Sequence, residues 1–166
     1  MKRQLINNML YSMIVCSILF LVSSCGGGTP APAGSTPPTP TPTQTVAQQI
    51  AKIWSVTNVK EDGITVFISG GTANIKVGYL NFKLDLSSVS AAKLTEYDGK
   101  TISGKWSVSA DGKSVTLTDL VPEPTDTSGT ISYTINSVAD KSFKITRNVL
   151  NRKTGATKTE YELTTP

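Results

Sequence analysis

Histidine is missing from all 166 residues of the sequence, and cysteine occurs only twice. Histidine is the usual general base and metal ligand near neutral pH. Its absence excludes Ser-His and Cys-His nucleophile systems and the commonest zinc, copper and iron sites. The glycine-rich motifs that bind nucleotide phosphates are missing too. We therefore expect a protein that is not an enzyme and that has no cofactor and no metal site.

Charged residues are absent from a long stretch near the N-terminus. Lys2 and Arg3 precede an apolar run from Met9 to Val22, about 14 residues without a charge, whereas a helix needs roughly 20 apolar residues to cross a bilayer. A short basic start followed by such a run is typical of a secretory signal peptide. We assign residues 1–24 to this signal.

The apolar run ends in Val22-Ser23-Ser24-Cys25, small residues directly before a cysteine. This stretch resembles the lipobox of bacterial lipoproteins, although Val22 stands where leucine is usual. The resemblance implies that the signal is cut before Cys25 and that this cysteine is lipidated. Cys16 leaves with the signal, so the mature chain cannot form an intramolecular disulfide. The alternative is an ordinary signal peptide, with Cys25 as a free thiol.

Residues 25–44 contain the lipidated cysteine and a tether without any charge. From Gly26 to Gln44 the sequence GGGTPAPAGSTPPTPTPTQ is dense in proline, glycine and threonine. Such a segment cannot bury apolar surface and favours extended polyproline II, so we expect a semi-rigid spacer of up to about 60 Å. Gly26 to Gly28 lack the aspartate that resembles an inner-membrane retention signal. The resemblance thus implies an outer-membrane lipoprotein that faces the periplasm by default, and surface exposure stays open.

Residues 45–166 have the length of one ordinary domain. The whole chain has 16 basic and 12 acidic residues, and loss of Lys2 and Arg3 with the signal leaves 14 basic residues. These are scattered among the acidic ones. We therefore expect the membrane as a partner, through the lipid anchor, and no nucleic acid.

Apolar and polar residues alternate with a period of two over most of the domain, which predicts half-buried strands. Turn dipeptides such as Asp62-Gly63 and Asp111-Gly112 separate these runs and favour antiparallel hairpins. The expected strands, eight in sequence, are Ile53 to Lys60, Ile64 to Ser69, Asn74 to Leu86, Thr101 to Ser109, Ser114 to Thr118, Thr130 to Val138, Ser142 to Leu150 and Ala156 to Thr164.

Three segments depart from this alternation. Thr45 to Trp54 and Ser88 to Tyr97 have a helical pattern, and Thr45 is a candidate N-cap. In the expected strand from Asn74 to Leu86 the apolar positions change parity at Gly78. One extra residue in a β-bulge there would return all of them to one face.

Eight antiparallel strands in a meander predict an all-β, up-and-down barrel, because closure removes the exposed sheet edges. Trp54, the stretch GKWSVSADGKSVTLT from Gly104 to Thr118, and YTINSVADKSFKI from Tyr133 to Ile145 resemble the lipocalin-like domains of secreted bacterial lipoproteins. The first strand lacks the Gly-x-Trp of a lipocalin, which occurs at Gly104 instead. This departure leaves a β-sandwich as the alternative.

Both tryptophans share a strand face with apolar residues, so we expect Trp54 and Trp106 to fill the core rather than touch a ligand. Most acidic residues of the domain lie in predicted turns, where their side chains form hydrogen bonds with their own backbone. These turn residues, from which we expect no catalytic pair, are Glu61, Asp62, Asp98, Asp111 and Asp140.

The candidate ligand-binding residue is Arg147, which falls in phase with Phe143, Ile145 and Val149 and would therefore point into the barrel. A buried charge is costly unless a carboxylate or an anionic ligand pairs with it. Tyr133 and Tyr161 lie on the apolar phases of their strands and complete the candidate site. The alternative is that Arg147 reaches water near the strand end or pairs with a carboxylate, for which the candidates are Glu162 and Asp119.

We therefore expect a membrane-anchored lipoprotein whose barrel binds a small apolar or amphipathic ligand or another envelope component. The alternative is a structural or protein-interaction module displayed on a stalk. The interior volume separates the two, because small-molecule pockets usually enclose about 300 Å³ or more.

Overall fold

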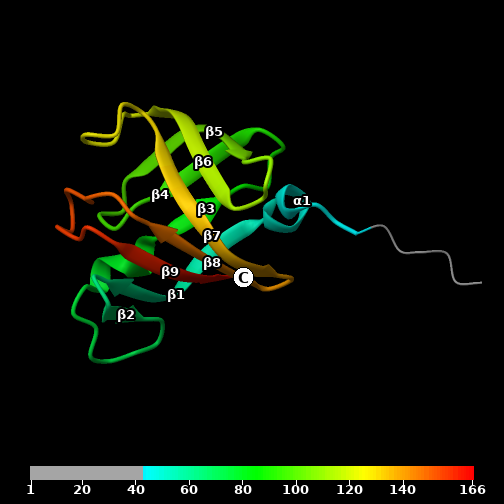
Figure 1. Cartoon of the computed structure of the whole chain (residues 1–166). Coiled ribbons are helices and arrows are strands. Elements are labelled where there is room, and N and C mark those ends of the chain that lie inside the picture. Colours follow the sequence, from blue (N-terminus) through cyan, green and yellow to red (C-terminus); the bar gives the residue numbers. More distant parts are fainter. Residues whose placement is uncertain (1–42) are drawn as a thin grey trace, which may run out of the picture. The chain divides into compact units, whose positions relative to one another are not determined.

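The computed structural model describes residues 43–166. The predicted signal, the predicted lipidation site at Cys25 and nearly all of the predicted tether lie outside these residues. The chain there contains a short helix, a 3₁₀ helix and nine strands (Figure 1). In chain order they are α1 (Val46–Ile50), β1 (Ile53–Glu61), β2 (Ile64–Ile68), η1 (Val77–Asn81), β3 (Lys83–Asp85), β4 (Ala91–Thr95), β5 (Thr101–Val108), β6 (Ser114–Val121), β7 (Ile131–Ala139), β8 (Ser142–Arg147) and β9 (Thr159–Thr164).

Eight of the strands form a closed antiparallel barrel. From β3 to β9 each strand pairs with the next along the chain, and β1 closes the circle by pairing with β3 on one side and β9 on the other. The predicted eight-stranded up-and-down barrel is confirmed. The β-sandwich alternative is wrong, since one continuous sheet closes on itself.

The membership of the barrel differs from the prediction at two strands. β2 forms a hairpin with the second half of β1 and pairs with no other strand of the described chain. Its place beside the first half of β1 is taken by β3. The missing eighth member is β4, in the segment that was predicted as a helix.

The helix predicted over Ser88 to Tyr97 is wrong. Ala92 and Leu94 are buried while Ala91 and Lys93 are exposed, which is the period of a strand. β4 pairs with β3 and β5 along its whole length. The pairing with two neighbours outweighs the high intrinsic helix propensity of alanine and leucine.

The long bulged strand predicted over Asn74 to Leu86 is also wrong. The parity of the apolar residues changes at Gly78 because the chain leaves the sheet there and forms η1 before β3 begins. A Cβ atom at Gly78 would lie 2.7 Å from the Tyr97 ring. The glycine thus permits η1 to pack closely against the chain after β4.

The two ends of the barrel are covered differently. At the start of β1, α1 begins with a capping box, in which Thr45 and Gln48 bond each other's backbone N–H groups, as the candidate N-cap predicted. At the far end of β1, Tyr79 of η1 donates a hydrogen bond to Glu61.

Both predicted core tryptophans are confirmed, since Trp54 and Trp106 are buried. They donate their indole N–H groups to the backbone oxygens of Ile50 and Ser88.

The Asp-Gly hairpin of β1 and β2 is confirmed. Asp62 and Gly63 both have positive φ, 48° and 86°, as a two-residue turn of the type favoured between antiparallel strands requires.

The glycine of the Gly-Lys-Trp motif in β5 is explained by the close approach of the neighbouring strand. A Cβ atom at Gly104 would lie only 2.3 Å from the Thr118 carbonyl oxygen, so the sheet itself demands glycine there.

Candidate functional site

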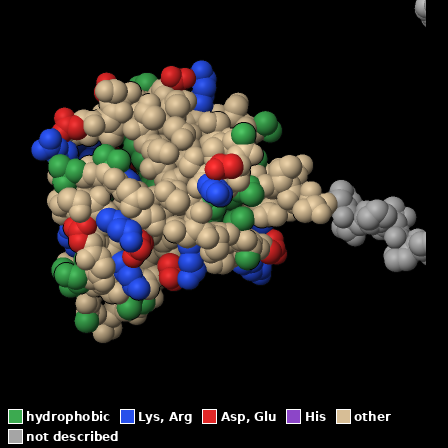
Figure 2. All heavy atoms as spheres, viewed as in Figure 1, with side chains coloured by type: hydrophobic (Ala, Val, Ile, Leu, Met, Phe, Trp, Pro, Cys, Tyr) green, Lys and Arg blue, Asp and Glu red, His purple; other side chains and the backbone are tan. Residues whose placement is uncertain are grey.

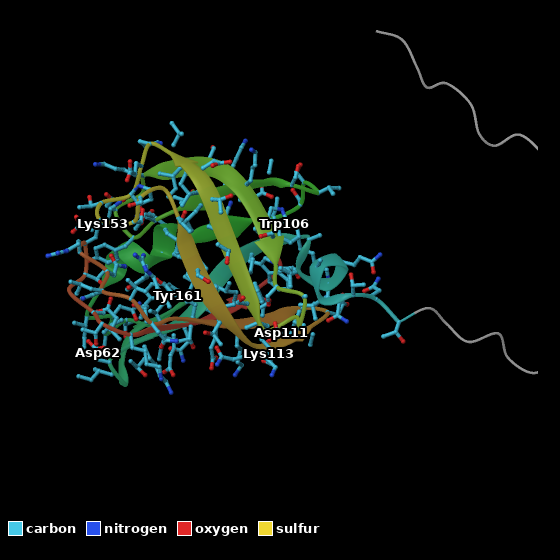
Figure 3. All side chains as sticks on the ribbon, turned by 45° about the horizontal axis from the view of Figure 1, so that its top comes forward. Asp62, Trp106, Asp111, Lys113, Lys153 and Tyr161 are labelled. Atoms are coloured by element: carbon cyan, nitrogen blue, oxygen red, sulfur yellow. The ribbon has the colours of Figure 1, made fainter. Side chains whose placement is uncertain are left out.

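Arg147, Tyr133 and Tyr161 come from the neighbouring strands β8, β7 and β9 and line one hollow inside the barrel. All three are buried, as their alternation with polar residues predicted. Figure 3 shows Tyr161 within the barrel and Lys153 at the end that carries the β1–β2 turn. The sequence therefore identified side chains that the fold brings together.

The hollow between these residues is nearly filled by protein. Tyr79, Phe82 and Leu94 pack into the same space, and the remaining volume is about 10 Å³. Such a volume holds about one water molecule. The interior as it stands therefore has no room for a fatty acid or a similar ligand at Arg147.

Arg147 itself is only 6% exposed. Among residues 43–166 its guanidinium makes no ion pair, and the two partners considered from the sequence are occupied. Lys144 lies 2.9 Å from Glu162, and Lys105 lies 2.9 Å from Asp119. An unpaired buried charge is destabilising, but the side-chain atoms of the described chain that are shielded from solvent and lack a hydrogen bond are Asn58 Oδ1 and Thr159 Oγ1, and no Arg147 nitrogen is among them.

The two tyrosines of the hollow are held in their neutral form. Burial raises the pKa of the Tyr133 hydroxyl well above its usual value, and the nearby Tyr161 raises it further. Burial likewise raises the pKa of Tyr161. Arg147 opposes both shifts but is the smaller effect. Both hydroxyls therefore stay protonated near neutral pH.

Two buried carboxylates close the same end of the barrel. Glu61 bonds the Lys76 ammonium and the Tyr79 hydroxyl, and Lys76 also donates to the Thr154 backbone oxygen at 2.7 Å. The prediction that Glu61 lies in a turn is therefore wrong, since it ends β1 and is 6% exposed. Its lysine and tyrosine partners come from the segment that was misread as a strand.

The second carboxylate, Glu96, bonds Lys153, which also lies 3.0 Å from Asp98. Burial alone would lower the pKa of Lys153, but the hydrogen bonds and the charges of Glu96 and Asp98 raise it. The loop that carries Lys153 is thereby fastened across the hollow. Both Glu61 and Glu96 thus accept hydrogen bonds from side chains of the described chain.

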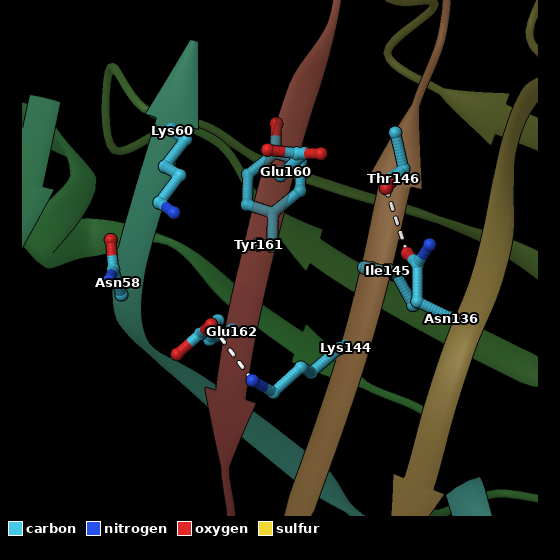
Figure 4. A pocket seen from close by; sticks show the side chains of 9 residues that line it. All are labelled: Asn58, Lys60, Asn136, Lys144, Ile145, Thr146, Glu160, Tyr161 and Glu162. Carbon is cyan, nitrogen blue, oxygen red and sulfur yellow. Dashed lines mark hydrogen bonds and ion pairs between the residues drawn. The ribbon is translucent and has the colours of Figure 1, made fainter. Parts of the chain in front are cut away.

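A larger hollow lies on the outer face of the barrel, across the strands β1, β9, β8 and β7 (Figure 4). We call it the outer groove, and its volume is about 210 Å³. Its floor is formed by outward-facing residues of the β8–β9 ladder: Lys144, Thr146, Glu160 and Glu162. Asn58 and Lys60 of β1 form one wall and Asn136 of β7 forms the other.

Sequence reasoning missed the outer groove. It depends on β-bulges, and a bulge adds one residue to a strand without any fixed sequence signature. The only available signal was a pair of asparagines, Asn58 and Asn136, inside expected strands, where this residue is uncommon.

No group of three or more Cys, Asp or Glu side chains between residues 43 and 166 is arranged to hold a metal ion. Within the same residues, no helix has the length and apolar character to cross a bilayer.

The sequence matches no protein-family model and no curated protein. Two solved structures are similar to the chain. A lipocalin-like protein from Bacteroides uniformis is 14% identical, covers 71% of this chain with 99% of its own length, and has a TM-score of 0.44. An uncharacterized protein from Bacteroides eggerthii is 11% identical, covers 69% of this chain with 98% of its own length, and has a TM-score of 0.41.

Proposed function

We propose that this chain is a lipid-anchored envelope protein whose barrel is a non-enzymatic module that binds another envelope component through its outer surface. The anchor is Cys25, and the segment up to Gln44 is the tether. The protein is held in the outer membrane and faces the periplasm.

The filled interior carries this proposal. Pockets for small molecules usually enclose about 300 to 1,000 Å³, whereas the interior hollow at Arg147 encloses about 10 Å³ and the hollow that Arg147 borders beside the β6–β7 loop about 150 Å³. The η1 helix and the Lys153 loop fill and fasten that end of the barrel. A barrel packed in this way offers a partner its surface and not its inside.

The character of the surface agrees with a partner other than nucleic acid. Figure 2 shows Lys and Arg side chains interspersed with Asp and Glu on the visible face, with no field of one sign. Several lysines of the barrel are paired with acidic neighbours, such as Lys52 with Asp140 at 2.7 Å. Binding of a polyanion would require a continuous basic patch.

Native mass spectrometry tests the proposal. The chain is extracted in detergent from its own envelope, and its mass is compared with that of the acylated polypeptide. We expect no further small molecule at a stoichiometry of one. A bound apolar or amphipathic molecule that stays with the protein after delipidating washes would contradict a filled barrel.

A ligand inside the barrel is the second candidate, because Arg147 is buried without a partner among the described residues. In that case η1 must move aside, and an anionic head group then pairs with Arg147 beside Tyr133 and Tyr161. A fluorescent fatty acid is the probe. This candidate requires binding that Arg147→Ala abolishes and Asn148→Ala, an exposed change one residue away, leaves intact, with circular dichroism to show that both variants fold.

A further inference from the structure

Two β-bulges flank the outer groove at the same level. The β8–β9 ladder is regular from Ser142 to Arg147. On one side of this ladder β1 has an extra residue between Val56 and Asn58, and on the other side β7 has one between Ile135 and Ser137. At each bulge two consecutive residues face outward, so that Asn58 and Asn136 stand on either side of the ladder (Figure 4).

The two asparagines differ in their hydrogen bonds within the barrel. The side-chain oxygen of Asn58 is shielded from solvent, yet it accepts no hydrogen bond among residues 43–166. A shielded polar atom without a partner destabilises a fold. Asn136 accepts a hydrogen bond from Thr146, a residue that is only 4% exposed although it faces outward. Bulges often re-aim side chains at binding sites.

The outer groove offers donors and acceptors side by side. Glu160 and Glu162 each use one carboxylate oxygen in an ion pair, with Lys158 and Lys144, which leaves the other oxygen as an acceptor. On the walls, the ammonium of Lys60 and the amide nitrogen of Asn136 are donors that make no hydrogen bond within the described chain. A hydroxyl group donates and accepts at once and therefore suits such an alternating set.

The charge and size of the outer groove narrow the class of ligand. Lys60 and Lys144 balance Glu160 and Glu162, so the lining carries no net charge and favours neither an anion nor a cation. The outward-facing side chains in it are polar, and Ile145 and Tyr161 of β8 and β9 add apolar surface against which the face of a sugar ring can pack. The volume of about 210 Å³ is below that of pockets for whole drug-sized ligands and suits one ring of a longer molecule.

We propose that the outer groove binds a neutral, hydroxyl-rich ligand, a sugar residue within an envelope or extracellular polysaccharide. This inference rests on the proposed function, since it names the part of the barrel surface that acts and the chemistry of the partner. The planar amides of Asn58 and Asn136 clamp the ring from both sides, and Glu160 and Glu162 accept hydrogen bonds from its hydroxyls.

An array of immobilised glycans tests the inference. The full chain in detergent is applied to neutral polysaccharides (glucans, mannans, galactans and xylans), to sulfated and uronic-acid polymers, and to an array of extended peptides. We expect binding to at least one neutral polysaccharide and none to the charged polymers. Its oligosaccharides are then titrated in solution with Asn136→Ala and Glu162→Gln, and we expect each variant to bind about tenfold more weakly, the value of one good hydrogen bond.

Asn148→Ala provides the matched control, because Asn148 is an exposed asparagine outside the outer groove. The inference is overturned if no neutral glycan binds, if a peptide binds in its place, or if the groove variants bind as well as the Asn148→Ala variant. None of these results decides the proposed surface function, which is tested separately by native mass spectrometry. Bulge variants that unfold are recognised by their circular dichroism, and Glu162→Gln, at an exposed position, then decides the matter.

Discussion

The Tyr79 hydroxyl joins η1 to the end of β1 through its hydrogen bond to the buried Glu61 carboxylate. Tyr79→Phe removes this donor and leaves Glu61 with Lys76 as its remaining side-chain partner. We expect a loss of about 1.5 to 3 kcal/mol in the free energy of unfolding, the usual effect of removing a hydrogen bond to a charged group. Urea denaturation followed by tryptophan fluorescence measures this difference.

The neighbouring Tyr97 provides the control, since its ring packs edge-on against Tyr79 at 5.0 Å but its hydroxyl makes no hydrogen bond in the described chain. Tyr97→Phe should leave the free energy of unfolding within about 0.5 kcal/mol of the unmodified protein. A loss in Tyr79→Phe no larger than that in Tyr97→Phe would mean that ring packing, which both variants keep, and not the bond to Glu61, holds η1 in place.

At the residue scale, the sequence predicts apolar positions better than polar ones. The period of two correctly predicted which aromatic residues point inward, because the face of a strand residue follows from its position alone. These residues are Trp54, Trp106, Tyr133 and Tyr161. The same period correctly predicted that Arg147 points inward. The role of Glu61 was out of reach, because its partners Lys76 and Tyr79 depend on how the chain returns after β2.

Among the elements, the β1–β2 turn is tied to the segment that leads into β9. The Asp62 carboxylate accepts hydrogen bonds from the Thr157 hydroxyl at 2.7 Å and from the Lys158 backbone N–H at 2.9 Å. These hydrogen bonds lower the pKa of Asp62 below its usual value, and the bond from the Thr157 hydroxyl has the largest effect. The ionised form is therefore the one that the folded state prefers.

A lowered pKa in the folded state has a defined sign in the pH dependence of stability. The unfolded chain binds more protons in the acid range, so the contribution of Asp62 is present above its unfolded pKa of about 3.9 and is lost as the pH falls through the folded pKa. We expect Asp62→Asn to lower the urea midpoint at pH 7 and to have a much smaller effect near pH 2.5. A midpoint difference that does not change with pH would contradict the role of the charge.

The count of eight barrel strands was correct although two elements were misassigned. The alternation in β2 is that of a strand, yet β2 pairs only with β1 in the described chain. The five residues of β4 have the period of a strand and were misread as helical, because helix propensity was given more weight than alternation over a short window. Which strand occupies a place in a sheet depends on distant partners, and local pattern carries no information on these.

On the scale of the whole molecule, the described domain and the segment before it contribute different physical properties. The barrel buries its apolar side chains in one continuous core, and the tether sequence is too rich in proline and glycine to form one. The outer groove belongs to the barrel alone, so its binding chemistry can be tested separately from anchoring. The proposed anchoring depends on one residue, Cys25, which lies outside the described residues.

The two cysteines allow a matched test of the lipid anchor. If Cys25 is acylated, Cys25→Ser should yield a protein without acyl mass, whereas Cys16→Ser should yield a chain that begins at Cys25 and carries the acyl groups. Each buried methylene contributes about 0.8 kcal/mol to membrane binding, so two or three acyl chains hold the protein firmly in a detergent phase. Intact mass and phase partition measure both properties. A Cys25→Ser chain that is still acylated, or an unmodified chain that begins elsewhere and carries no lipid, would contradict the assignment of Cys25 as the anchor.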